Sequence, residues 1–100
     1  MNQLERIEKM EGILDRAEAA LADLRKALEN YQGIEDELNE LADYYENGLW
    51  QKDHEDDETG RLPSDLKRGI LSEDGIWNLL VEQDALLLMM KRAVKRQALT

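Results

Sequence analysis

The sequence contains no cysteine, and only one of its 100 residues is proline. Without cysteine the chain has no disulfide bonds, no thiolate metal sites and no thiol nucleophile. Aromatic residues are also few, and most of the apolar residues are Leu, Ile, Ala and Met, which favour helices more than sheets. The composition therefore predicts an all-helical protein.

Long apolar runs and positive charge are both scarce. The longest apolar run is the six residues 85–90, far short of the roughly 20 that a membrane-spanning helix needs. The N-terminus carries Glu5 and Arg6 and lacks a signal-peptide core. The net charge of -10 disfavours binding to nucleic-acid phosphates and anionic lipids. We expect a cytoplasmic protein that neither crosses a membrane nor binds nucleic acid directly.

The N-terminal half carries the strongest pattern, a stripe of apolar residues at spacings of three and four. This spacing predicts an amphipathic or coiled-coil helix over residues 3–46 that ends at Asn47 and Gly48. The phase slips at Gly33, which indicates either a bend or a break, and we expect a kinked continuation. The stripe comprises Leu4, Ile7, Met10, Leu14, Ala17, Leu21, Leu24, Leu28 and Tyr31, and it resumes at Ile34, Leu38, Leu41 and Tyr45.

The middle of the chain, residues 47–72, differs from both ends, because it holds the only proline, the only histidine and a run of carboxylates over 53–58. We expect an irregular connector with short helical turns at about 50–58 and 63–69. A second long helix is predicted at 73–97, with Ser72 as its N-cap. Acidic residues in its first turn and basic residues in its last suit the helix dipole.

These elements predict an all-α fold in a single domain over residues 1–100. The long N-terminal helix is expected to pack antiparallel to the C-terminal helix, as a helical hairpin or a three-helix bundle. At 1.5 Å per residue the two helices would measure roughly 65 and 37 Å, so the shorter cannot cover the longer. A break at Gly33, packing of the connector, or a homodimer would each cover the remaining apolar surface.

The chemistry-bearing residues do not form a recognisable catalytic or cofactor site. An EF-hand that begins at Asp53 would have Glu58 where glycine is required, so calcium binding is not predicted. His54 has no nucleophile as an evident partner, and Ser64 and Ser72 are explained as helix caps. We expect no enzyme activity, no cofactor and no metal.

The segment 57–76, from Asp57 to Ile76, is less generic than the helices around it. Together with Arg6–Glu11 and the pair Tyr44 and Tyr45, it resembles a family of small bacterial proteins catalogued as domain of unknown function 4298. The resemblance covers nearly the whole chain. It implies a short bacterial cytoplasmic protein, and it assigns no activity, ligand or catalytic residue.

Three functions follow as hypotheses. The first is a protein–protein interaction or regulatory module with an unidentified protein partner. The second is an acidic mimic that inhibits a nucleic-acid-binding protein, and the third is a metal-binding protein or enzyme that uses Asp53, His54, Asp57 and Glu58. Trp50 either ties the connector to the helices or anchors a partner. The candidate partner-binding residues of the first hypothesis are Trp50, Asp57, Glu58, Asp65, Lys67, Arg68 and Trp77.

Overall fold

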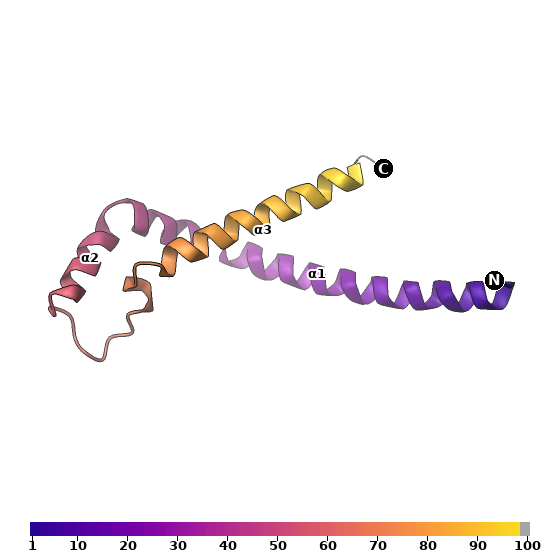
Figure 1. Ribbon diagram of the computed structural model, residues 1–100, viewed down its shortest axis with the longest axis horizontal. Helices are drawn as coiled ribbons and strands as arrows, with labels where there is room; N and C mark the ends of the chain where they lie inside the picture. Colours follow the sequence, from indigo (N-terminus) through magenta and orange to yellow (C-terminus); the bar gives the residue numbers. More distant parts are fainter. Residues whose placement is uncertain (99–100) are drawn as a thin grey trace. The chain divides into compact units, whose positions relative to one another are not determined.

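The computed structural model describes residues 1–98, and these form helices joined by turns and loops, without strands (Figure 1). The order of the elements is α1 (Gln3–Glu46), α2 (Leu49–Glu58), the short 3-10 helix η1 (Gly69–Leu71) and α3 (Gly75–Ala98). The predicted all-helical class is confirmed. None of the helices over these residues has the length and apolar character needed to span a bilayer.

Helix α1 begins at a side-chain cap and ends at a glycine with a left-handed backbone conformation. Asn2 Oδ1 accepts a hydrogen bond from the Glu5 backbone N–H at 2.8 Å, and Asn2 Nδ2 donates to Glu5 Oε1 at 3.2 Å. This exchange satisfies one of the donors left open at a helix N-terminus. At the other end Gly48 adopts a φ of 92°, the left-handed conformation that favours glycine. The predicted end at Asn47 and Gly48 is therefore correct.

Gly33 does not interrupt α1, which is helical on both sides of it. The phase slip in the apolar stripe thus falls inside one continuous helix. A Cβ at Gly33 would meet no atom within 4 Å. No close approach of another group accounts for the glycine.

The chain divides into two compact units, Met1–Glu37 and Leu38–Thr100. The first unit is a single stretch of α1. The second holds the end of α1 together with α2, η1 and α3, and η1 contacts both α2 and α3. Leu71 of η1 and Ile76 of α3 are the buried hydrophobic residues of the described chain. The core of the second unit therefore lies where η1 meets the start of α3.

The turn between η1 and α3 is closed by Ser72 and Gly75. Ser72 Oγ donates to the Gly69 carbonyl at 2.9 Å and accepts from the Gly75 N–H at 3.1 Å. A Cβ on Gly75 would lie 2.8 Å from both the Gly69 oxygen and Ser72 Oγ, closer than real Cβ contacts allow. Ser72 thus caps the turn, and α3 begins at Gly75 rather than at the predicted residue 73.

The connector differs in detail from its prediction. Helix α2 matches the expected short helix closely. The sequence predicts a helical turn at 63–69, but residues 63–68 are not helical. They contain one tight turn, in which the Leu66 N–H donates to the Pro63 carbonyl at 3.3 Å. The helical turn that follows it within the connector is η1, which begins at Gly69.

Candidate functional site

Three aromatic rings lie in contact in the second unit, two of them stacked and the third tilted, and we call Tyr45, Trp50 and His54 the aromatic stack. The Trp50 ring lies 4.9 Å from the His54 ring at an angle of 12°, and 5.0 Å from the Tyr45 ring at 56°. Trp50 and His54 meet because residues four apart share one face of a helix. Trp50 Nε1–H also donates to the Ile70 carbonyl at 2.8 Å. The stack therefore joins the end of α1, helix α2 and η1.

The imidazole of His54 is held at both nitrogens. Nδ1 lies 2.7 Å from the Leu71 carbonyl oxygen, and because a carbonyl only accepts, Nδ1 carries the proton of this bond. Nε2 lies 3.3 Å from a Glu58 carboxylate oxygen one helical turn further on. His54 thus links α2 to the buried end of η1, with Nε2 directed toward the Glu58 carboxylate.

A second link joins α1 to α2 through Tyr44, whose hydroxyl donates to the Asp53 carboxylate at 2.7 Å. Burial, the hydrogen bond to Asp53 and the negative charge of Asp53 all disfavour the phenolate. Together they raise the pKa of Tyr44 to about 12. This tyrosine therefore remains a hydrogen-bond donor throughout the physiological range.

Arg68 organises the loop between α2 and η1. Its Nε and Nη2 lie 2.9 and 2.8 Å from Oδ1 of Asp57. The other contacts are to main-chain carbonyls: Nη1 donates to Ser64 at 3.1 Å and to Leu66 at 3.3 Å, and Nη2 donates to Pro63 at 3.0 Å. A planar guanidinium with five N–H donors can make such a set, whereas an ammonium cannot.

Three potential metal ligands converge beside the aromatic stack. One ligand atom each from His54, Glu58 and Glu73 lies within 4.8 Å of the other two. His54 and Glu58 come from α2, and Glu73 comes from the turn that Ser72 and Gly75 close. Two carboxylates and one imidazole are hard and borderline donors, a mixture that suits first-row divalent cations.

The predicted candidate residues separate into two groups. Trp50, Asp57 and Arg68 make the contacts within the second unit given above. Asp65, Lys67 and Trp77 are exposed on its surface, and Glu58 is exposed but also contacts His54. In the metal hypothesis, Asp53 and Asp57 accept hydrogen bonds from Tyr44 and Arg68, so only His54 and Glu58 of that set lie together with a further carboxylate.

Sequence reasoning missed Tyr45 and Glu73 as members of this region. The spacing of the apolar residues predicts Tyr45 as part of the α1 stripe, and its position fits both roles. The sequence predicts Glu73 in the first turn of the C-terminal helix, whereas that helix begins two residues later, at Gly75. No sequence signal points to the Leu71 carbonyl as the partner of His54.

Comparison with known proteins gives one result. The family model described as Domain of unknown function (DUF4298) matches residues 7–93. No curated protein and no solved structure matches the chain. The matched region contains the aromatic stack, Arg68 and the His54, Glu58 and Glu73 group. Since the match covers most of its length, the chain belongs to the DUF4298 family.

Proposed function

We propose that this protein is a protein–protein interaction module in which α1 pairs with another helix as a coiled coil. The observation that carries the proposal is the exposed apolar stripe of α1. Leu21 and Leu24 are 66% and 52% exposed. From Ile7 to Tyr31 the stripe follows strict steps of three and four, the spacing of the a and d positions of a heptad repeat. Exposed members are Leu4, Ile7, Met10, Leu14, Leu21, Leu24 and Leu28.

The first unit cannot cover this stripe by itself, because it consists of one helix. Helix α3 is the other long helix of the chain, and its length sets a limit. With 44 and 24 residues, α1 and α3 measure roughly 66 and 36 Å at 1.5 Å per residue. Even full antiparallel pairing would leave roughly 30 Å of α1 uncovered. A helix from outside the chain would cover the remainder.

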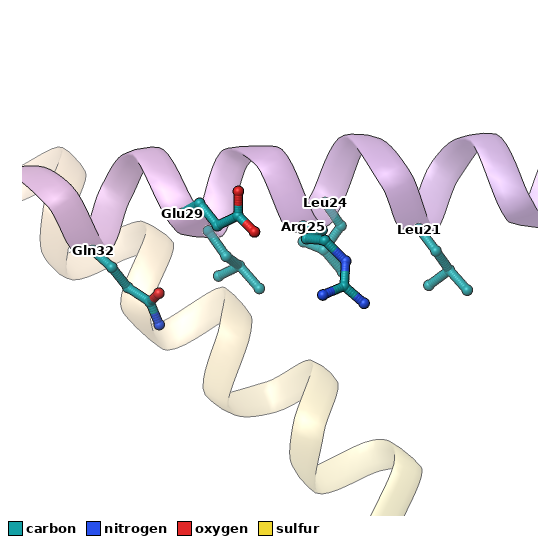
Figure 2. Close-up of a pocket in the computed structure, with 6 residues that line it drawn as sticks. Leu21, Leu24, Arg25, Glu29 and Gln32 are labelled. Carbon is teal, nitrogen blue, oxygen red and sulfur yellow. The ribbon is translucent and has the colours of Figure 1, made fainter.

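The residues that border the stripe support a helical partner. A shallow surface depression on α1 is lined by Leu21, Leu24, Arg25, Leu28, Glu29 and Gln32. Figure 2 shows Leu21, Arg25 and Gln32 projecting from the same side of the helix. An apolar seam with charged and amide side chains along its edge is the arrangement found at coiled-coil interfaces.

A second copy of the chain is the partner to test first. If Ile7 is an a position, Arg6 falls at g and the following e position is Glu11. In a parallel pair, g of one helix lies beside the next e of the other, so Arg6 and Glu11 would form ion pairs across a homodimer. The same register places Ala19 at f, on the side away from the seam.

Two matched substitutions test the proposal. Leu24→Glu places a carboxylate in the seam, and Ala19→Glu places the same group on the opposite side. Multi-angle light scattering should give the mass of a dimer for the wild type and for Ala19→Glu, and the mass of a monomer for Leu24→Glu. If the wild type is a monomer, cross-linking in cells should capture a partner with Ala19→Glu and not with Leu24→Glu. Equal masses and equal cross-links for both variants would contradict the proposal.

The second candidate function, an acidic mimic, is favoured by one part of α1. Residues 29–46 hold seven carboxylates and no basic side chain, and all seven are exposed: Glu29, Glu35, Asp36, Glu37, Glu40, Asp43 and Glu46. Such a surface would compete with nucleic acid for a basic protein. Binding should then weaken steeply with added salt and should be displaced by DNA or RNA. A complex that persists in 0.5 M salt would argue for the coiled coil instead.

A further inference from the structure

We infer that His54, Glu58 and Glu73 form a Zn²⁺ site that fastens α2 to the turn before α3. The imidazole Nε2 and one oxygen from each carboxylate supply three protein ligands. Their ligand atoms all lie within 4.8 Å of one another. This site is independent of the α1 seam, since its three ligands belong to the second unit.

The distances suit closure around a cation. Zinc binds nitrogen and oxygen at about 2.0–2.2 Å, so tetrahedral ligand atoms stand about 3.5 Å apart. The Nε2 of His54 is already 3.3 Å from Glu58 Oε1. Both glutamates are exposed, so modest rotation of their side chains is enough to bring the third ligand to the same separation.

The imidazole is presented in the form that a metal requires. The proton on Nδ1 is directed to the Leu71 carbonyl, which leaves the lone pair of the neutral ring on Nε2, 3.3 Å from the Glu58 carboxylate. Histidine ligands in metalloproteins commonly donate their other N–H to a carbonyl or carboxylate in this way. Stacking against Trp50 restricts rotation of the ring. Only 17% of the His54 side chain is exposed, so the ring is held in place by packing.

Glu73 is held in position by the turn that contains it. Ser72 and Gly75 on either side of it are tied to each other and to Gly69 by the two hydrogen bonds of Ser72 Oγ. The close approach at Gly75 leaves no room for a side chain there. The backbone that carries Glu73 is therefore fixed relative to the Leu71 carbonyl that orients His54.

The donor set selects the class of cation. Calcium and magnesium prefer oxygen ligands alone, whereas imidazole suits zinc and its neighbours in the first transition series. Two carboxylates neutralise the charge of a dication, and three protein ligands leave one position for water. Without a metal, the same geometry would be satisfied by a protonated His54 that donates to Glu58. Glu73 is a ligand in the zinc site, whereas it takes no part in the ion pair between His54 and Glu58.

Calorimetric titration of the full-length chain with ZnCl₂ tests the site. The wild type should bind one Zn²⁺ per chain. Glu73→Gln replaces the negatively charged carboxylate of an exposed ligand by a neutral amide, and it should weaken Zn²⁺ binding at least tenfold. Glu55→Gln makes the same change at an exposed position of α2 outside the group and should bind as the wild type does. Absence of saturable binding to the wild type, or equal affinities for the two variants, would overturn the proposal.

Thermal unfolding supplies a second readout that does not depend on heat of binding. A cation that binds only the folded chain raises the melting temperature in proportion to the logarithm of its concentration. Zn²⁺ should therefore raise the melting temperature of the wild type and of Glu55→Gln, with little effect on Glu73→Gln. Glu58→Gln should behave as Glu73→Gln does, and circular dichroism before titration confirms that each variant is folded. Equal shifts for all four proteins would indicate binding elsewhere and would overturn the assignment.

Discussion

Replacement of Arg68 by alanine should remove the largest set of side-chain contacts in the loop between α2 and η1. Arg68 donates to Asp57 and to the carbonyls of Pro63, Ser64 and Leu66. Its side chain is 38% exposed, so water competes for these donors and each carbonyl contact is worth only about 0.5 kcal/mol. Asp57 is 18% exposed, and leaving a charged acceptor of this kind without its partner costs about 1–2 kcal/mol. Three carbonyl contacts and the pairing with Asp57 together give an expected loss of about 2.5–3.5 kcal/mol.

Urea denaturation followed by tryptophan fluorescence measures this loss, because Trp50 and Trp77 both lie in the second unit. Arg68→Lys keeps the charge but cannot reach all four acceptors, so it should lose about half as much. Lys67→Ala is the matched control, since it removes a neighbouring exposed cation and should change stability by less than about 0.5 kcal/mol. If Arg68→Ala also changes the free energy of unfolding by less than about 0.5 kcal/mol relative to the wild type, the reasoning is refuted.

Three further predictions concern single positions. Gly33→Ala should stabilise the chain by about 0.5–1 kcal/mol in urea denaturation, because Gly33 lies inside a continuous helix with open space around it; destabilisation would show that α1 bends there. Gly75→Ala should lower the melting temperature by several degrees, since its Cβ would meet the Gly69 carbonyl at 2.8 Å. The raised pKa of Tyr44 means that its stabilising contribution is complete below pH 10 and is lost between pH 10 and 12. Tyr44→Phe should remove that loss from the stability profile, and an unchanged profile would show that the bond to Asp53 is not responsible.

The sequence predicted those parts of the fold that depend on periodic patterns. The stripe from Leu4 to Tyr31 indicated α1 because a regular helix repeats the same environment every three or four residues. Asn47 and Gly48 marked its end because glycine tolerates a positive φ. Such signals are local, so they can be read without knowledge of the rest of the chain.

The contacts around His54 could not be predicted in the same way. The acceptor of its Nδ1–H is the main-chain carbonyl of Leu71, 17 residues away, and every residue has a carbonyl. The pairing of Arg68 with Asp57 was similarly ambiguous, because several carboxylates lie near it in the sequence. Glu73 was assigned to the helix dipole, since the displacement of the start of α3 to Gly75 depends on a tertiary contact with Gly69.

The small core of the second unit has a thermodynamic consequence. In the described chain the buried hydrophobic residues are Leu71 and Ile76. Thermal unfolding of a single copy therefore exposes little apolar surface that was buried in the folded state. Its heat-capacity change should fall below the usual ~12–15 cal/mol/K per residue, and its stability should vary only gently with temperature. Pairing through α1 would bury additional apolar surface. A heat-capacity change that grows with protein concentration would thus report the pairing from calorimetry alone.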